Sequence, residues 1–362
     1  THDLTLAAGM QYVHAFRKLL FMPSELTLGT EYSYDDLSDR SIGYDIRTDQ
    51  AVHIVGAYLQ NEWKTRKWSL LIGGRLDKHN LVDHAIFSPR ANVRFNPSES
   101  VNLRVSYAGG YRAPQAFDED MHIAIVGGKR VRIRLADDLK EERSHSVSLS
   151  ADLYHTFGSV QANLLVEGFY TMLEDVFTLE KIGEDAQGNI IKERRNASGA
   201  TVAGVGAEAK AGIPGRFELQ LGYTFQRSRY DEPEKWSDDV TPQRRMFRSP
   251  DHYGYLTANV NLTRDFTASV FGNYTGRMLV QHNAGYIERD TERLTPDFWD
   301  MGLRLSYNFR LTKQLRLELN AGVKNLFDSF QKDLDFGQNK DAAYIYGPAV
   351  PRTYFIGAKF AL

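Results

Sequence analysis

The chain has 362 residues, a formal net charge of -2 at pH 7 and no cysteine. The near-neutral charge gives no sign of a nucleic-acid partner, and the lack of cysteine excludes a disulfide framework or a thiolate site. No run of about 18 apolar residues occurs, which excludes membrane-spanning helices but not a membrane barrel, because the strands of such a barrel are half polar.

Apolar and polar residues alternate along the whole chain, which is the signature of β-strands with two different faces. In 101–112, for example, Leu103 and Val105 alternate with Arg104 and Ser106. The same period predicts an all-β protein of about fifteen strands without a long helix. In chain order the strands are expected at 3–14, 24–36, 48–63, 66–78, 87–95, 101–112, 145–154, 160–170, 190–213, 216–226, 254–262, 266–274, 299–310, 315–323 and 354–362.

The connections between these strands alternate between short and long. Short ones are expected near 64–65, 96–98, 156–157, 213–215, 264–265 and 311–313, with a somewhat longer one at 15–23. Long ones are expected near 37–47, 79–86, 112–141, 181–189, 229–249, 281–296 and 327–350. Tight turns at one rim and long loops at the other are typical of an up-and-down antiparallel transmembrane β-barrel of the outer-membrane kind.

The two faces of each strand then receive different environments. In 312–328 the apolar stripe from Leu315 to Val323 is expected to face lipid, and Arg316, Glu318 and Lys324 the lumen. The alternative, a soluble all-β protein, would need a second sheet against every apolar face and a cover for its edges. Aromatic residues near the long loops suggest a girdle at one lipid interface: Tyr111, Tyr170, Phe225, Tyr274 and Trp299.

The strand count bears on the domain organisation. If Leu362 ends at the periplasmic rim, counting backwards places Thr1 on the extracellular side. Closed single-chain barrels of this kind have an even number of strands. We therefore expect residues 1–362 to form one barrel portion, the C-terminal fifteen or so strands of a barrel of about 22.

Several motifs then carry a resemblance. Tyr111-Arg112-Ala113-Pro114 ends one strand, and an altered box, Ala136-Asp137-Asp138-Leu139-Lys140-Glu141-Glu142, precedes the next. Near the C-terminus stand Val323-Lys324-Asn325-Leu326-Phe327-Asp328 and Pro351-Arg352-Thr353-Tyr354. In order and spacing the set resembles the barrel of TonB-dependent outer-membrane receptors over most of the chain. Among these receptors, it is most similar to those of Bacteroidetes-type bacteria.

The resemblance implies active import rather than enzymatic catalysis. It suggests an integral protein of the Gram-negative outer membrane, in contact with lipid, that imports a scarce nutrient chelate such as a ferric siderophore with energy from the TonB–ExbB–ExbD complex. The plug through which TonB would act is not recognisable in this sequence. Alternatives are a SusC-like glycan or peptide importer working with a surface lipoprotein, a haem receptor, and a passive porin-like channel.

Candidate ligand-binding residues gather in the loop 112–141. Arg112 is expected to point inward at the top of the lumen and to pair with an acid of 137–142. The loop also holds an acidic cluster with a histidine, Asp118, Glu119, Asp120 and His122, and a basic run, Lys129, Arg130, Arg132 and Arg134. The basic run could steer an anionic chelate, or it could form a salt-bridged hairpin. His122 could be a haem ligand, although a solvated loop histidine is the common case.

A second candidate site is the acidic stretch 333–341. Asp333, Asp335, Asn339 and Asp341 place oxygen atoms at alternate positions around Gly337, a spacing that suits Ca²⁺. The bidentate acid of a complete calcium loop is missing, so a hydrogen-bonded acidic loop without metal is the simpler interpretation. No spacing in the chain points to a catalytic triad.

Overall fold

The computed structural model describes residues 1–42, 46–114, 125–126, 129–186 and 188–361. Almost all of its regular structure is β-strand, as the alternating pattern predicts. No helix in these ranges is long and apolar enough to cross a membrane.

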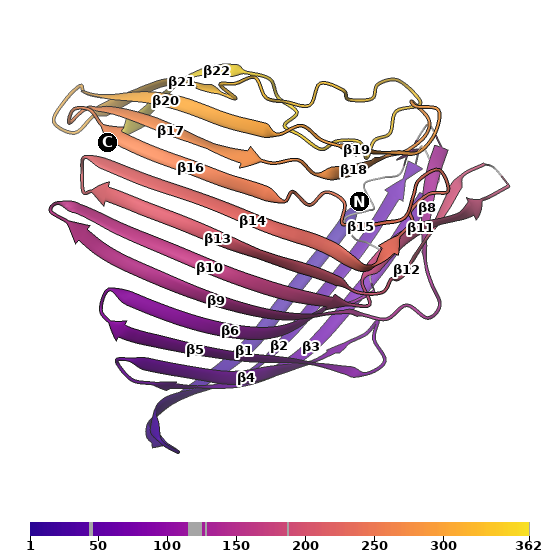
Figure 1. The fold of residues 1–362 in the computed structure, drawn as a ribbon, viewed down its shortest axis with the longest axis horizontal. Coiled ribbons are helices and arrows are strands. Elements are labelled where there is room, and N and C mark those ends of the chain that lie inside the picture. Colours follow the sequence, from indigo (N-terminus) through magenta and orange to yellow (C-terminus); the bar gives the residue numbers. More distant parts are fainter. Residues whose placement is uncertain (43–45, 115–124, 127–128, 187, 362) are drawn as a thin grey trace.

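Fifteen strands follow one another in an antiparallel meander, with one further short strand attached to it (Figure 1). Each strand pairs with the next, so the predicted up-and-down order is confirmed. The strand predicted at 3–14 is also confirmed, because it pairs with the following strand along its length. The strands are β1 (His2–Leu19), β2 (Met22–Ser41), β3 (Ile46–Lys64), β4 (Trp68–His79), β5 (Ala85–Ser98), β6 (Val101–Arg112), β9 (Glu142–Phe157), β10 (Val160–Glu174), β13 (Ala200–Ile213), β14 (Phe217–Glu234), β16 (His252–Asn261), β17 (Phe266–Thr275), β20 (Phe298–Arg310), β21 (Arg316–Lys324) and β22 (Thr353–Ala361).

The two rims differ as the sequence predicts, although some boundaries were wrong. Short turns at 20–21, 65–67, 99–100, 158–159, 214–216, 262–265 and 311–315 form one rim, and long connections the other. The long loop expected at 37–47 is instead mostly strand, because β2 and β3 continue to Ser41 and Ile46. The single strand expected at 190–213 is two strands, with a break at 197–199.

The outer face of the sheet carries the apolar stripes. Leu305 and Leu319 are each 40% exposed, and neighbouring strands continue the surface through pairs such as Val105 with Leu149. The opposite face is polar: Asn92 donates to Ser106 over 2.6 Å, and Arg304 forms an ion pair with Glu318. A soluble protein would bury such an apolar surface, so the arrangement is that of a barrel wall between lipid and a wet lumen.

The long connections form their own small sheets. In the four-stranded sheet, β12 (Ile190–Asn196) runs parallel to β8 (Lys129–Leu135), so that two separate loops are joined above the wall. A second sheet pairs β18 (Leu279–His282) with β19 (Thr291–Leu294). These elements are β7 (Ile125–Val126), β8 (Lys129–Leu135), β11 (Phe177–Glu184), β12 (Ile190–Asn196), β15 (Gln243–Arg245), β18 (Leu279–His282) and β19 (Thr291–Leu294).

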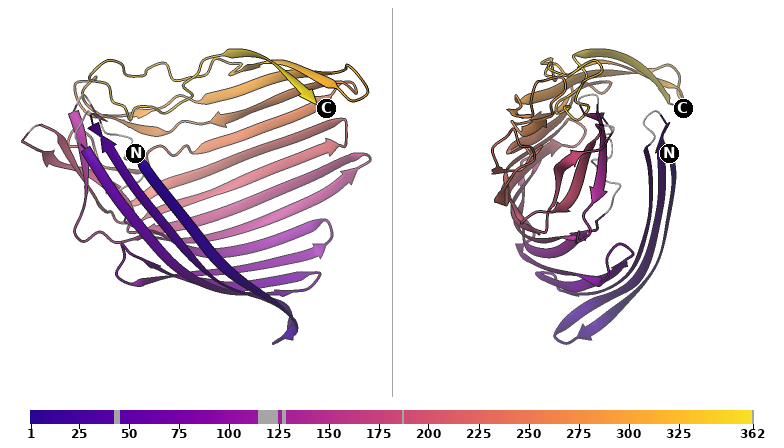
Figure 2. Two further views of the ribbon diagram at one scale, coloured as in Figure 1. Left: turned by 180° about the vertical axis from the view of Figure 1, so that it is seen from behind. Right: turned by 90° about the vertical axis from the view of Figure 1, so that its right-hand side faces the viewer.

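The main sheet curves into an open trough. Its first and last strands, β1 and β22, do not pair with each other, and the small loop sheet lies within the curved outline when the molecule is seen from the loop end (Figure 2). The buried apolar clusters lie among the loops: Val82, Ile86 and Ala113 in one, and Met278, Val280 and Tyr344 in the other. The loop layer, not the wall, therefore has the packing of a folded domain.

Candidate extracellular mouth

A polar cavity of about 300 Å³ opens among the long loops. Its walls come from the end of β6, from β11 and β12, from β14 and the segment after it, from β18, and from the loop 325–352. The sequence predicts a mouth formed by the long loops 112–141, 229–249 and 327–350, and each of the three contributes to this cavity. The contributions of β11–β12 and of the segment 276–297 were not expected.

Arg112 reaches this cavity from the top of β6. Its guanidinium lies 3.5 Å from a carboxylate oxygen of Glu142 and 5.5 Å from the ring centre of Phe177. The predicted anchor to an acid of 137–142 is thus present. The neighbouring Glu141 pairs instead with His84 and Arg143. Burial alone would raise the pKa of Glu141, but the hydrogen bonds from Arg143 and His84 hold it below its usual value.

Three more basic residues line the same cavity: Lys192, Arg194 and Arg248. Arg194 is almost completely buried, and its guanidinium lies 6.0 Å from the centre of the Phe177 ring. The backbone of Arg248 has a φ of 55°, a conformation that residues other than glycine rarely adopt. Its guanidinium donates a hydrogen bond of 2.8 Å to the carbonyl of Ile345 and a second one to the carbonyl of Ala343. These bonds attach the loop 325–352 to the mouth.

Aromatic side chains complete the lining. Trp236 and Phe247 meet edge to face with ring centres 6.3 Å apart, and the Trp236 indole donates 3.0 Å to Glu292 of β19. Phe177 of β11 and Tyr230 of β14 also line the cavity. Cationic groups beside aromatic faces form a surface that attracts a negatively charged ligand with flat rings.

The other residues proposed in 112–141 have separate positions. Arg132 lies 3.8 Å from Asp185 and Arg134 lies 3.3 Å from Glu193, so both form ion pairs with the β11–β12 hairpin. Neither lines the cavity. Lys129 and Arg130 belong to β8, but their side chains are not described. Asp118, Glu119, Asp120 and His122 lie outside the described residues, and the ligand roles of all these residues stay predictions.

The acidic stretch 333–341 is a hydrogen-bonded hub of the loop layer. Asp333 accepts from Tyr344 over 2.9 Å and from Tyr346. Asp335 accepts from His282 over 2.9 Å, and Asp341 accepts from the backbone nitrogen of Asn283 over 2.8 Å.

The hub carboxylates therefore point to different donors. Asn339 is exposed, and among the residues that the structure describes no group of three or more His, Asp or Glu side chains could hold a metal. Calcium binding at Asp333, Asp335, Asn339 and Asp341 stays a prediction from spacing alone.

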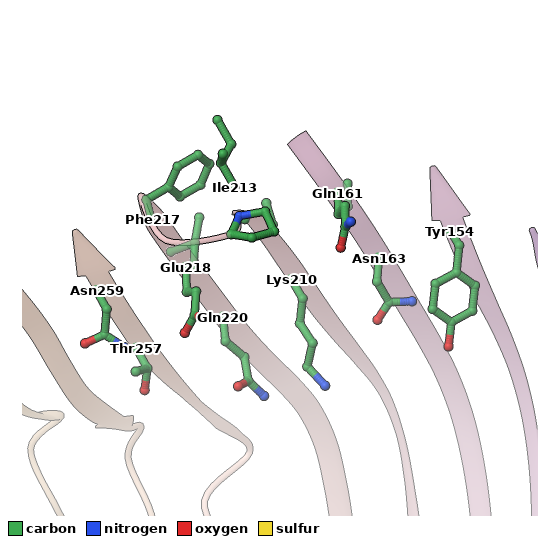
Figure 3. Close-up of a pocket in the computed structure, with 15 residues that line it drawn as sticks. Tyr154, Gln161, Asn163, Lys210, Ile213, Phe217, Glu218, Gln220, Thr257 and Asn259 are labelled. Carbon is green, nitrogen blue, oxygen red and sulfur yellow. The ribbon is translucent and has the colours of Figure 1, made fainter. Parts of the chain in front are cut away.

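A larger cavity, of about 490 Å³, lies at the opposite end of the wall, beside the turn 214–216 (Figure 3). Its lining residues come from five adjacent strands and the turn, and they combine apolar residues such as Ile213 and Leu219 with neutral polar ones such as Asn163 and Gln220. Its one lysine, Lys210, forms an ion pair of 2.6 Å with Glu208. This cavity lacks the combination of several cations and aromatic faces found at the mouth.

The motifs behind the resemblance make structural contacts. Asn325, buried and with a φ of 50°, donates to the carbonyls of Ser329 and Val350, and Asp328 accepts from the backbone of Arg352 over 2.9 Å. The two C-terminal boxes thus hold the base of the last long loop closed. With the Arg112–Glu142 contact, they act as loop architecture.

An apolar outer face, a polar inner face, tight turns at one rim and a loop-built polar mouth at the other together define an integral β-barrel of the outer membrane, in the receptor class. The chain belongs to the family of TonB dependent receptor-like β-barrels, whose family model matches residues 3–326. This is a family of transporters and not of enzymes, and it places the chain in the Gram-negative outer membrane.

Solved structures of low sequence identity share the fold. The siderophore receptor PirA from Acinetobacter baumannii matches with a TM-score of 0.66 and 18% identity, over 99% of this chain and 54% of that one. A mutant of the ferric enterobactin receptor PfeA from Pseudomonas aeruginosa, in complex with enterobactin, matches with a TM-score of 0.69 and 18% identity, over 99% and 54%. The ferric-catecholate import receptor Fiu from E. coli K12 matches with a TM-score of 0.71 and 15% identity, over 99% and 54%.

The chain thus spans about half the length of these structures. Comparison with curated protein sequences finds no match. The likeness to receptors of Bacteroidetes-type bacteria gains no support from these comparisons.

Proposed function

We propose that this barrel belongs to a receptor that imports a ferric siderophore, or a related anionic metal chelate, across the outer membrane with energy delivered through TonB. The observation that carries the proposal is the mouth cavity, whose lining combines Arg112, Lys192, Arg194 and Arg248 with aromatic rings. Guanidinium groups bind oxyanions through short, charge-assisted hydrogen bonds, and their planes stack on flat rings.

The chemistry of the cavity favours one class of chelate. An iron complex of catechol groups carries negative charge and presents aromatic rings, so Arg112 would bind its oxygens while Trp236 and Phe247 contact its rings. PirA is a siderophore receptor, PfeA a ferric enterobactin receptor and Fiu a ferric-catecholate import receptor. These three ligands support the general class of ligand that we propose. Identities of 15% to 18% do not point to a particular siderophore.

Uptake of iron-55 as a ferric tris-catecholate complex, by cells that make the intact receptor, tests the proposal. We expect Arg112→Gln and Lys192→Gln together to lower uptake by about tenfold or more, the effect of losing about 1.4 kcal/mol of binding. The matched control is Arg132→Gln, because Arg132 pairs with Asp185 away from the cavity lining. Uptake that stays unchanged in the double variant, or falls as far in the control, would contradict the binding role of the mouth.

The energy source needs a separate test. Cells without a functional TonB should lose uptake of the chelate altogether, because active import against a gradient requires coupling. If the protein is a passive porin-like channel, loss of TonB will leave uptake of the chelate unaffected. If it is a glycan importer, an excess of the chelate will not compete with uptake of the glycan. These results would refute the TonB step and the ligand class, respectively.

A further inference from the structure

Tyrosine–histidine pairs recur on the outer face of the wall. Tyr32 of β2 bonds to Nδ1 of His53 on β3 at 3.0 Å, and Tyr107 of β6 bonds to Nδ1 of His145 on β9 at 2.9 Å. A third pair joins Tyr223 of β14 to Nδ1 of His252 on β16 at 2.6 Å. In every pair the two residues come from neighbouring strands, and the histidine lies toward the loop end of its strand.

The shared geometry determines what the imidazole offers. When the tyrosine hydroxyl donates to Nδ1, the ring proton is on Nε2, so the Nε2–H group remains as a donor. No hydrogen bond to Nε2 of His252 occurs within the described part of the chain. His252 and Tyr223 are both exposed on the outer face, so this donor is available to a ligand outside the protein.

The third pair has a cation beside it. The Phe225 ring lies 4.9 Å from the His252 ring, and the Arg227 guanidinium lies 5.7 Å from the Phe225 ring centre. Arg227 follows Leu221, Tyr223 and Phe225 at every second position of β14, so it lies on the same outer face. It is exposed, and it makes no ion pair with any carboxylate of the described residues.

The surroundings locate this group at the boundary between lipid and water. The girdle residues Tyr274 and Trp299 lie on β17 and β20, the next two strands after β16; their ring centres are 4.4 Å apart, and Trp299 is 50% exposed. Aromatic belts of this kind lie at headgroup level. Leu221 and Leu256 form the apolar surface immediately below. A guanidinium, an imidazole and a phenol at this level meet the phosphate groups of lipids, which carry the complementary charge.

We propose that Arg227, His252 and Tyr223 form a binding site for the phosphate group of an outer-leaflet lipid. Arg227 binds the phosphate by charge-assisted hydrogen bonds, and His252 donates from Nε2. Tyr223 is a positioning residue that holds the imidazole ring, and Phe225 separates and supports the two basic groups. The Tyr32–His53 and Tyr107–His145 pairs repeat the imidazole part of the arrangement around the wall.

The test uses the intact receptor, purified in detergent, with phosphatidic acid as the probe. We expect phosphatidic acid to raise the Tm, while diacylglycerol with the same chains and inorganic phosphate do not. The double variant Arg227→Gln, His252→Gln should lose at least half of that shift. Arg264→Gln, which removes an exposed arginine from the turn 262–265 at the opposite rim, is the matched control and should keep the whole shift.

Other results would overturn the proposal. An unchanged shift in the double variant, or an equal loss in the Arg264 control, would show that the lipid binds elsewhere or without specificity. An equal shift with inorganic phosphate would show a general anion site. If the double variant does not assemble, Tyr223→Phe, which keeps the ring and removes only the hydroxyl, should still weaken retention of phosphatidic acid in native mass spectrometry, and full retention would count against the proposal.

Discussion

Asp333 shows how a carboxylate can organise a loop without a metal. It accepts hydrogen bonds from Tyr344 and Tyr346, and Arg293 lies 3.6 Å away. Burial opposes ionisation, but these donors lower the pKa of Asp333 below its ordinary value. Burial and the same hydrogen bond raise the pKa of Tyr344 to about 12, so the phenol keeps its proton and remains a donor at neutral pH.

The lowered pKa gives a pH prediction with a definite sign. A carboxylate whose pKa is lowered by folding stabilises the structure above its unfolded pKa, and this contribution is lost as the pH falls through the folded value. We expect the loop 325–352 to stay protected from hydrogen exchange down to about pH 4 and to lose protection below it. Asp333→Asn should remove that acid transition. A transition of equal size in the variant would assign it to another group.

At the scale of single residues, the sequence predicts contacts that a short segment determines. The pairing of Arg112 with Glu142 follows from two adjacent boxes, and it is present. The calcium hypothesis came from spacing along the chain, whereas the directions of Asp335 and Asp341 are set by His282 and Asn283, more than 50 residues away. Residues such as Arg248 and Trp236 carried no local signal, because only the packing of several loops brings them together.

At the scale of elements, the strands were predictable wherever the wall separates lipid from water. The alternation fades where both faces are wet, so the upper ends of β2, β3 and β14 were not foreseen. The small strands β8 and β12 pair in parallel between two distant loops. In β8 the residues Arg130, Arg132 and Arg134 alternate with Val131, Ile133 and Leu135, which is the period of an extended strand. The alternation does not tell which distant strand will pair with it.

The assignment of the two faces is tested by one substitution placed on each. Leu305→Arg puts a charge on the outer face, and we expect it to cost about 2–4 kcal/mol near the bilayer midplane and to impair assembly. Ser306→Arg puts the same side chain on the inner face, beside Asn320, where water and polar groups can accept it. The amount of heat-resistant barrel in the outer membrane is the measurement. Equal effects of both substitutions would refute the assignment.

The loop 112–141 and the wall should behave as separable elements. Truncation of 118–134 removes most of β8 and with it the ion pairs of Arg132 and Arg134 to the β11–β12 hairpin. We expect the hairpin to become sensitive to protease and uptake to fail. The wall should still assemble, because the β6–β9 ladder continues to Arg112 without the loop. Loss of the assembled barrel would show that the loop is needed for wall formation.

At the scale of the whole molecule, the curved sheet leaves β1 and β22 without partners across the opening. Unpaired strand edges cannot face the hydrocarbon of a bilayer, because their amide and carbonyl groups would lack hydrogen bonds. We therefore expect residues 1–362, expressed alone, not to form a closed, heat-resistant barrel. A compact and protease-resistant pore from this segment would show that the two edges can pair directly.

The parity of the rims, the outer apolar stripes and the receptor family were accessible from the sequence, because each rests on patterns repeated along the chain. The mouth cavity was only partly accessible. Its position among the long loops could be expected, but its lining depends on contacts such as Arg248 to Ala343 that join loops far apart in sequence. Loop packing of this kind depends on three-dimensional fit and not on a period.

The central claim, that the mouth binds an anionic aromatic chelate of iron, is tested most directly by fluorescence of Trp236. Trp236 is one of four tryptophans in the chain, and it lies in the lining of the cavity. We expect the tryptophan fluorescence of the intact, purified receptor to be quenched during titration with a ferric tris-catecholate, and the quenching to reach a plateau as the binding site saturates. Trp236→Phe should lose the saturable part, whereas Trp68→Phe, near the turn rim, should retain it. The same saturable quenching in Trp236→Phe and in the unaltered receptor would contradict the claim.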